Sequence, residues 1–195
     1  MNSTEELEYY NDVYSQSEEY RKEPAHSKFI NVWMDILKMI RSEESVIEIG
    51  CGSGQLAKLL IENGKKYAFG FDYSLEAIRI AKELNPNNSD LFLVKDVYTF
   101  KEIDCDTVIC TETLEHLDDD LFVFSLLKPG TRFIFSVPSF DSKAHKRLYK
   151  DIEYIKSRYH FLIIKEIKEY SVNSKEIKLS SEGDNKVFLI DSVCR

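Results

Sequence analysis

The chain has 195 residues, of which 43% are hydrophobic and 31% charged, with a formal net charge of −8. This length suits one α/β domain, and the negative charge argues against broad binding to the phosphate backbone of nucleic acids. The four cysteines form no CxxC pair, so we expect neither a disulfide framework nor a metal site. The acidic N-terminus does not resemble a secretory signal, and no apolar run approaches the roughly 20 residues of a membrane span, so we expect a cytoplasmic protein without a membrane partner.

The N-terminal part is charged and rich in tyrosine. Leu7, Tyr10, Val13 and Tyr14 fall near helical spacing, and a second apolar helical pattern follows after Pro24. We therefore expect N-terminal cover helices over residues 1–41 and one α/β unit over residues 42–195.

Residues 46–49 form a short β-branched run, which predicts a buried strand of a parallel sheet. Three glycines at every second position follow, and residues 55–61 then show helical periodicity. A strand, a glycine turn and a helix bring a nucleotide-like ligand against bare backbone. The dinucleotide-binding pattern would need glycine or alanine at Gln55, and no lysine follows the glycines, which excludes a P-loop.

The second predicted strand ends at Asp72. A carboxylate at this place can accept hydrogen bonds from both hydroxyls of a ribose; the alternative is an acid at the start of the next helix, residues 74–84. Strands follow at residues 91–94 and 106–111. A sheet of this type reverses its strand order at the latter, so residues 111–116 should face a ligand.

The remaining elements follow in order. Asp118–Asp120 should open a helix over residues 121–127, since acids are favoured at a helix N-terminus; metal binding is the alternative. A strand at residues 131–137, a short helix around Ile155, and strands at residues 161–170 and 187–193 complete the prediction. A polar loop, residues 171–186, should separate the last two strands.

Several of these segments together resemble a known family. Residues 48–54, 71–72, 95–97 and 106–117 occur in the order seen in class I S-adenosylmethionine-dependent methyltransferases, and residues 127–138 resemble the family's fifth-strand hairpin. The resemblance implies an α/β fold with a doubly wound, mostly parallel sheet of seven strands, the last antiparallel, and helices on both faces. The Leu-Glu-His-Leu sequence of residues 114–117 points to the branch acting on small molecules.

The resemblance implies S-adenosyl-L-methionine as the cofactor and S-adenosyl-L-homocysteine as the product. Asp96 would accept a hydrogen bond from the adenine amino group, although a plain turn residue is the alternative. Tyr14 and Arg21 become candidates to touch the methionine carboxylate or the acceptor, unless their helix merely covers the domain. The expected cofactor-binding residues are Glu48, Gly50, Cys51, Gly52, Gly54, Asp72, Tyr73, Asp96, Val97, Thr111 and Tyr14.

Methyl transfer from a sulfonium requires an acceptor held in line, and its electrophile needs no metal. An alcohol acceptor also needs a base, which accelerates the reaction by roughly 10²–10⁴. His116, at the end of the segment after the fourth strand, is our first candidate, and an orienting role is its alternative. His145, just past the fifth strand, is the second, with solvent exposure as its alternative.

Residues 142–160 carry six Lys or Arg against Asp151 and Glu153. Such a run would attract an anionic acceptor, although a solvated helix face explains it equally. The expected acceptor-binding residues are Arg21, Glu112, Lys143 and Arg147.

The sequence thus predicts a methyltransferase acting on a small, polar, anionic acceptor, with O-methylation favoured over N-methylation. A sugar, nucleotide-linked or phosphorylated surface-polysaccharide precursor would fit. The alternatives are a non-catalytic cofactor-binding subunit that needs a partner protein and, disfavoured by Gln55, an NAD-dependent dehydrogenase.

Overall fold

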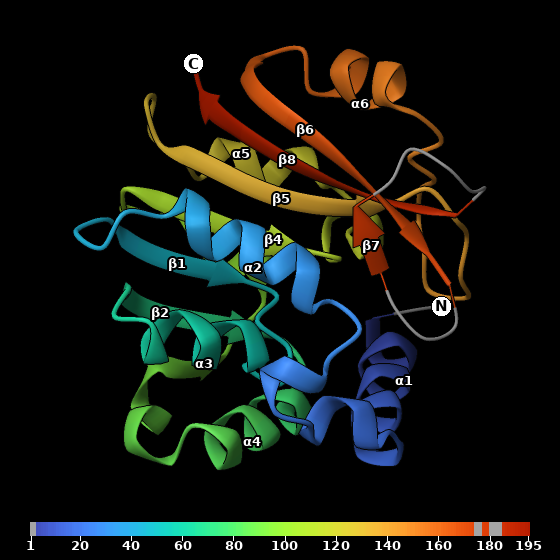
Figure 1. Cartoon of the computed structure of the whole chain (residues 1–195). Helices are drawn as coiled ribbons and strands as arrows, with labels where there is room; N and C mark the ends of the chain where they lie inside the picture. The colour runs from blue at the N-terminus through green and yellow to red at the C-terminus, as the bar shows by residue number, and fades with distance from the viewer. Residues whose placement is uncertain (1–2, 174–176, 180–184) are drawn as a thin grey trace.

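The computed structural model describes residues 3–173, 177–179 and 185–195, and these contain one eight-stranded sheet of order β3-β2-β1-β4-β5-β8-β6-β7 (Figure 1). The first five strands in this order are parallel, whereas β8 is antiparallel to β5 and β6, and β7 is antiparallel to β6. The strands are β1 (Ser45–Ile49), β2 (Lys66–Asp72), β3 (Phe92–Val94), β4 (Thr107–Thr111), β5 (Arg132–Pro138), β6 (Leu162–Val172), β7 (Ile177–Leu179) and β8 (Lys186–Cys194).

Helices lie on both faces of the sheet (Figure 1). The α-helices are α1 (Ser3–Gln16), α2 (Ile30–Met39), α3 (Gln55–Glu62), α4 (Leu75–Leu84), α5 (Leu121–Ser125) and α6 (Ile152–Arg158). The 3₁₀ helices are η1 (Glu18–Arg21), η2 (Pro24–His26), η3 (Pro86–Leu91), η4 (Val97–Thr99) and η5 (Leu114–His116). None of the described helices is long and apolar enough to span a membrane.

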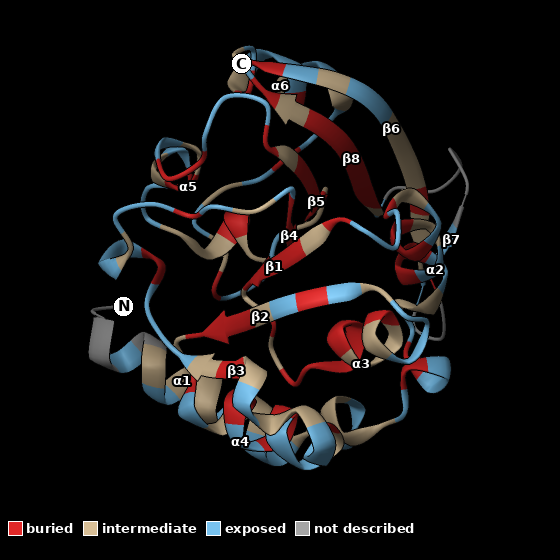
Figure 2. Ribbon diagram, turned by 90° about the vertical axis from the view of Figure 1, so that its left-hand side faces the viewer, coloured by how far each residue is buried: buried red, intermediate tan, exposed pale blue. Residues whose placement is uncertain are grey.

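Two apolar cores form because successive strand residues point to opposite faces. In β5, Phe133 and Phe135 join the core beneath α5 and α6, while Ile134 between them joins the core beneath α2, α3 and α4. Buried residues accordingly run along the central strands, as Figure 2 shows for β1, β5 and β8.

The predicted fold class is confirmed, and every strand predicted from the sequence forms within two residues of its expected ends. The last strand, β8, is antiparallel as predicted. The strand number was wrong, because the sheet has eight strands rather than seven, and the additional strand β7 is antiparallel to β6.

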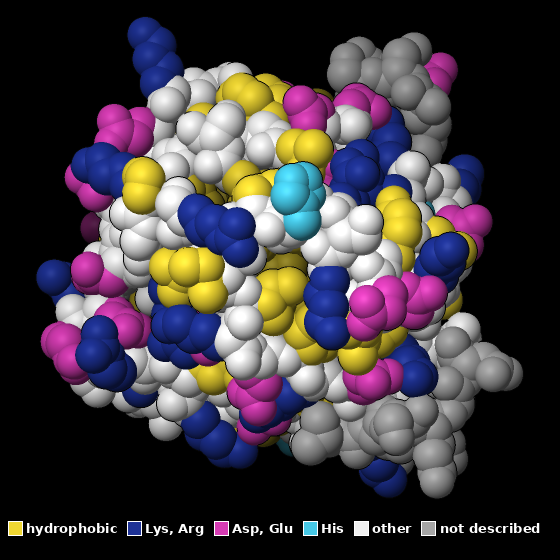
Figure 3. Space-filling view, turned by 90° about the horizontal axis from the view of Figure 1, so that it is seen from above, with side chains coloured by type: hydrophobic (Ala, Val, Ile, Leu, Met, Phe, Trp, Pro, Cys, Tyr) yellow, Lys and Arg dark blue, Asp and Glu magenta, His cyan; other side chains and the backbone are white. Residues whose placement is uncertain are grey.

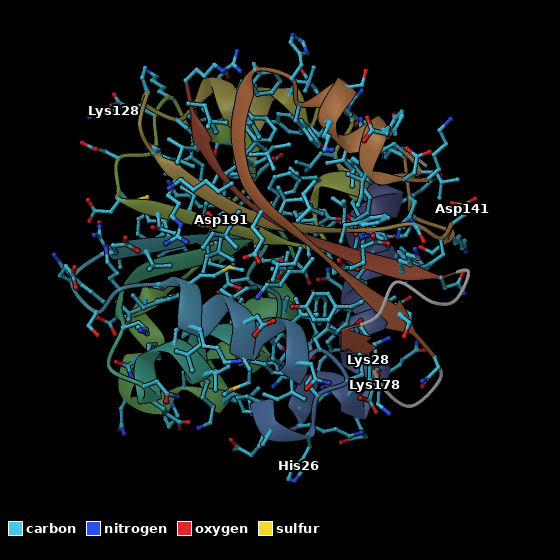
Figure 4. The ribbon with its side chains drawn as sticks, turned by 45° about the horizontal axis from the view of Figure 1, so that its top comes forward. His26, Lys28, Lys128, Asp141, Lys178 and Asp191 are labelled. Carbon is cyan, nitrogen blue, oxygen red and sulfur yellow. The ribbon has the colours of Figure 1, made fainter. Side chains whose placement is uncertain are left out.

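The missed strand, β7, falls inside the segment predicted as a polar loop, of which residues 174–176 and 180–184 lie outside the described structure. Hydrogen bonds to residues far away in the sequence hold β7 in place. Its Ile177 is 1% exposed, donates its N–H to the Lys28 carbonyl (3.3 Å) and accepts from the Asn31 amide (2.8 Å). Lys28 and the β7 residue Lys178 accordingly lie beside each other in Figure 4. A three-residue strand has too little periodicity to be recognised without these contacts.

Candidate active site

A cavity of about 1010 Å³ opens at the carboxyl ends of β1, β2, β3 and β4, with α1 along one wall. It lies at the point where the strand order reverses between β1 and β4, as expected for a ligand site in such a sheet. The predicted residues that line it are Tyr14, Glu48, Gly50, Cys51, Gly52, Asp72, Tyr73, Asp96, Val97, Thr111, Glu112, His116 and His145. Gly54, Arg21, Lys143 and Arg147 are not part of the lining.

The glycine loop after β1 is shaped by left-handed backbone at three positions. Gly50 and Gly52 have φ of 69° and 52°, where a side chain is strained. A Cβ on Gly50 would lie 2.2 Å from the Thr113 Oγ1, and one on Gly52 would lie 2.8 Å from the Tyr14 hydroxyl. The loop therefore keeps bare backbone toward the cavity, and Tyr14 approaches it from α1.

Gly54, which was predicted to bind the cofactor, does not line the cavity and instead allows close packing of α3. It is the N-cap of α3, and an added Cβ would lie within 3.0 Å of Phe92, Ala81 and Asn85. Its missing side chain lets α3 pack closely against β3 and α4, away from the cavity.

Asp72 is 8% exposed at the end of β2, and its carboxylate already organises the glycine loop. One oxygen accepts from the Gly52 N–H (3.1 Å) and the other from the Ser74 N–H (2.9 Å). Burial raises the pKa of Asp72 to about 6, against the effect of these backbone hydrogen bonds. The side chain is thus fixed in orientation at the cavity wall.

Glu48 is 2% exposed and accepts a hydrogen bond from the Tyr67 hydroxyl (2.8 Å). Burial raises the pKa of Glu48 to about 8, so this carboxyl is largely protonated at neutral pH. Tyr67 was not among the predicted site residues. The feature of the sequence that points to Tyr67 is Gly70, because a Cβ at that position would lie 2.1 Å from the Tyr67 hydroxyl.

Helix α1 lies along the cavity and makes side-chain contacts with two different parts of its wall. Tyr10 places its hydroxyl 2.6 Å from Nδ1 of His116, and Asn11 accepts from the Ser74 hydroxyl (2.7 Å). Burial raises the pKa of Tyr14 well above its usual value. Tyr10, which was not among the predicted site residues, therefore touches a predicted catalytic histidine.

Arg21 does not reach the cavity. Its guanidinium donates to the carbonyls of Tyr14 (3.1 Å) and Ser17 (3.2 Å) and lies 3.5 Å from the Glu76 carboxylate. These partners hold the end of α1 against α4, which leaves the predicted contact with cofactor or acceptor without structural support.

The predicted adenine-side residues lie at the opposite rim. Asp96 is exposed, lines the cavity and caps η4 by accepting the Tyr98 N–H (3.0 Å). Val97, which is 4% exposed, and Tyr73 also face the cavity. Asp96 thus caps a turn, which was the alternative interpretation of this residue, and at the same time faces the cavity.

After β4, Glu112 adopts a φ of 48°, the only positive value among the described non-glycine residues. Such strain is concentrated at functional sites. Its carboxyl accepts from the Ser136 hydroxyl (2.7 Å), and burial raises its pKa to about 7. Glu112 thereby stays on the cavity wall, as predicted.

Two histidines and a buried glutamate meet at this end of the cavity. The ring centroids of His116 and His145 lie 4.9 Å apart. Glu115, which directly precedes His116 in the chain, is 1% exposed. Burial lowers the pKa of His116 to about 4 and also lowers that of His145, so both rings are neutral at pH 7. His26, in contrast, points away from the protein body in Figure 4.

The basic run of residues 142–160 is largely used within the protein. Arg147 donates to the carbonyls of Leu114 and Leu117, both at 2.7 Å, and Arg158 binds the fully buried Asp120. Lys143 lies over the ring of Tyr9, 5.3 Å from its centroid. On the face seen in Figure 3, basic and acidic side chains are interspersed. The run therefore does not form the anion-attracting patch that we expected, and Arg147 positions the loop after β4 instead.

Comparison with known proteins agrees with this geometry. A family model described as a methyltransferase domain matches residues 19–170. A ubiquinone biosynthesis O-methyltransferase of Neisseria meningitidis is 30% identical over 121 residues, which cover 56% of this chain and 50% of that protein. The chain thus spans about half the length of this curated relative.

Solved structures share the fold at lower identity. The methyltransferase in a complex with the Trm112 activator of Haloferax volcanii is 16% identical, with a TM-score of 0.69 over 95% of this chain and 97% of that one. Magnesium protoporphyrin IX methyltransferase of Synechocystis, solved with bound S-adenosylhomocysteine, is 17% identical. Its TM-score is 0.61, and the match covers 85% of this chain and 82% of that one. Since the family model matches most of its length, the chain belongs to the class I S-adenosylmethionine-dependent methyltransferases.

Proposed function

We propose that this protein transfers a methyl group from S-adenosylmethionine to a hydroxyl oxygen of a small molecule. The observation that carries the proposal is the single cavity wall that joins the bare glycine loop and Asp72 to the histidines beyond β4. One end fits a nucleoside, and the other presents groups that handle protons.

The residues present fit the cofactor. The left-handed glycine loop leaves backbone open to a ligand, and the fixed Asp72 carboxylate suits two ribose hydroxyls. We propose that Asp96 and Val97 bind the adenine and that Glu48, Tyr14 and the loop enclose the remainder. Bound there, S-adenosylmethionine supplies a methyl group already activated on a sulfonium sulfur.

The acceptor end lies between η5, the segment after β5 and α1. His116 and His145 are our candidates for handling the proton of the acceptor hydroxyl, and the Tyr10 hydroxyl on α1 contacts His116 at this end.

The charge of the cavity bears on the acceptor. Its lining includes seven acidic residues, whereas Lys28 and Lys95 are its only lysines among the residues described. Burial raises the pKa of Glu48 to about 8, that of Glu112 to about 7 and that of Glu115 well above its usual value, and the other four acids still outnumber the two lysines. Such a wall disfavours an anionic acceptor, so we propose a neutral hydroxylated compound, such as a sugar or a phenol, in place of the phosphorylated precursor. The name of the Neisseria relative, an O-methyltransferase, supports oxygen as the methylated atom.

A partner-dependent enzyme is the second candidate. The Haloferax protein of the same fold is recorded in a complex with a methyltransferase activator. If this chain also needs a partner, it will bind the cofactor alone but methylate no acceptor in purified form.

The first test is cofactor binding by calorimetry. The wild-type chain should bind S-adenosylhomocysteine and not NADH, and Asp72→Ala should weaken binding by about 10- to 150-fold, the effect of losing hydrogen bonds to a charged group. Asp72→Asn, which keeps the size of the side chain, separates loss of charge from disruption of the loop, and Asp90→Ala at an exposed position is the control. Equal affinity in Asp72→Ala and wild type would refute the ribose assignment, and preference for NADH would refute the function.

A further inference from the structure

Glu115, His116 and His145 form a three-residue cluster at the acceptor end of the cavity, and we call them the Glu–His–His cluster. One carboxylate oxygen of Glu115 and one ring nitrogen of each histidine all lie within 4.8 Å of one another. η5 supplies the first two residues and the segment after β5 supplies the third, and all three line the cavity. The cluster is therefore open to a small ligand.

Glu115 carries an unsatisfied atom. Its Oε2 is buried and has no hydrogen-bond partner among the described residues. Burial and the neighbouring Glu112 raise the pKa of Glu115 well above its usual value. The positive charge of Arg147 opposes this shift, but its guanidinium donates to the carbonyls of Leu114 and Leu117 and not to Oε2 of Glu115. Since leaving a buried polar atom without a partner is unfavourable, this position lacks a cation or a donor.

Both histidines are held in the way that metal-binding histidines are held. Nδ1 of His116 faces the Ala144 carbonyl at 3.2 Å, and Nδ1 of His145 faces the Phe140 carbonyl at 3.0 Å. A carbonyl oxygen only accepts, so Nδ1 of His145 carries the proton and its Nε2 keeps a lone pair. Nδ1 of His116 also lies 2.6 Å from the Tyr10 hydroxyl, and Nε2 of His116 is free to bind an ion in the tautomer whose Nδ1 donates to Ala144. Nε2 of His116 lies 3.6 Å from Oε1 of Glu115. A backbone carbonyl that fixes the second ring nitrogen is the usual support of a histidine ligand.

We propose that the Glu–His–His cluster binds one divalent first-row transition-metal ion. Two imidazoles and a carboxylate are a common three-residue set for such ions, and they leave positions open for a ligand from the cavity. Bonds of about 2.1 Å would bring the three ligand atoms to roughly 3.0–3.4 Å from one another, a modest contraction of the observed cluster. Imidazole ligands favour Mn²⁺ to Zn²⁺ over Mg²⁺ or Ca²⁺. This proposal replaces our sequence-based expectation of no metal site.

The ion has a role in the proposed reaction, and this role rests on the proposed function. An acceptor hydroxyl beside the ion would have a lowered pKa. Its O–H bond breaks, the electron pair stays on oxygen and the proton passes to solvent. With the ion bound, the two histidines act as metal ligands, and this role replaces the proton-handling role proposed above for the metal-free site.

Metal binding can be tested without an acceptor. Mn²⁺ is titrated into the chelator-treated protein, and the unbound ion is followed by electron paramagnetic resonance. The wild type should bind one Mn²⁺ per chain, and Zn²⁺ should displace it. His145→Ala and Glu115→Gln should each weaken Mn²⁺ binding at least about tenfold, the lower limit seen even for residues that only support a ligand. His160→Ala, the same substitution at an exposed position outside the cavity lining, should bind like wild type.

Circular dichroism establishes that each variant is folded, and Glu115→Gln keeps the volume of the side chain in case His145→Ala does not fold. Absence of Mn²⁺ and Zn²⁺ binding by the folded wild type, or an equal loss in His160→Ala, overturns the metal site. The same preparations are titrated with S-adenosylhomocysteine. Binding of the cofactor product without metal leaves the proposed function standing, whereas metal binding without it removes the function alone.

Discussion

The buried carboxyl of Glu48 predicts an unusual dependence of stability on pH. Its pKa rises from 4.5 to about 8 in the folded protein because burial disfavours the charged form. Between these values the folded chain holds a proton that the unfolded chain releases. The contribution of Glu48 to stability is therefore present below about pH 4.5 and is lost as the pH rises to about 8.

At about 1.36 kcal/mol per pKa unit, this shift corresponds to a loss of roughly 4–5 kcal/mol. Glu48→Gln stays neutral, and its amide oxygen can still accept from the Tyr67 hydroxyl. The variant should therefore match the wild type near pH 4.5 and exceed its free energy of unfolding by several kcal/mol near pH 8.

Urea unfolding of both proteins across this pH range, followed by circular dichroism, measures the difference. Glu8→Gln, at an exposed position on α1, changes the formal charge equally and should show no such divergence. Stability curves of wild type and Glu48→Gln that stay parallel would show that Glu48 is ionised in the folded state, and the burial argument would then be wrong.

Two further substitutions test the loop and the core. Gly50→Ala should destabilise the fold by more than Gly64→Ala, because both sites have φ near 70° but only Gly50 has Thr113 in the way; thermal unfolding should show the excess, and equal losses would show that backbone strain alone acts. Asp120→Asn should lower the free energy of unfolding by about 3 kcal/mol, since it leaves the partly buried Arg158 without its carboxylate. Its affinity for S-adenosylhomocysteine should not change, and a weakened affinity would show that this network supports the cavity.

Local patterns in the sequence were sufficient for the elements that carry the cofactor side. Alternating and continuous apolar runs depend on neighbouring residues only, so the strands and the main helices could be predicted. The glycines after β1 are likewise a local requirement, since their left-handed φ angles exclude side chains. The order of motifs then led to the family that the comparisons confirm.

The fate of individual charged side chains could not be predicted in this way. Arg147 and Arg158 read in sequence as members of a basic surface, yet one binds the carbonyls after β4 and the other Asp120. Their partners lie 30 or more residues away along the chain, and composition does not tell a paired cation from a free one. The prediction of an anionic acceptor depended on this distinction.

The sequence by itself thus determined the fold class, the glycine loop and the position of Asp72, because each follows from chain-local stereochemistry and from strand order. Only the tertiary structure decided that Tyr10 reaches His116, 106 residues away, that β7 extends the sheet, and that Glu115 meets two histidines. Those contacts join segments that are unrelated in sequence, and they form only when packing of the two cores brings the segments together.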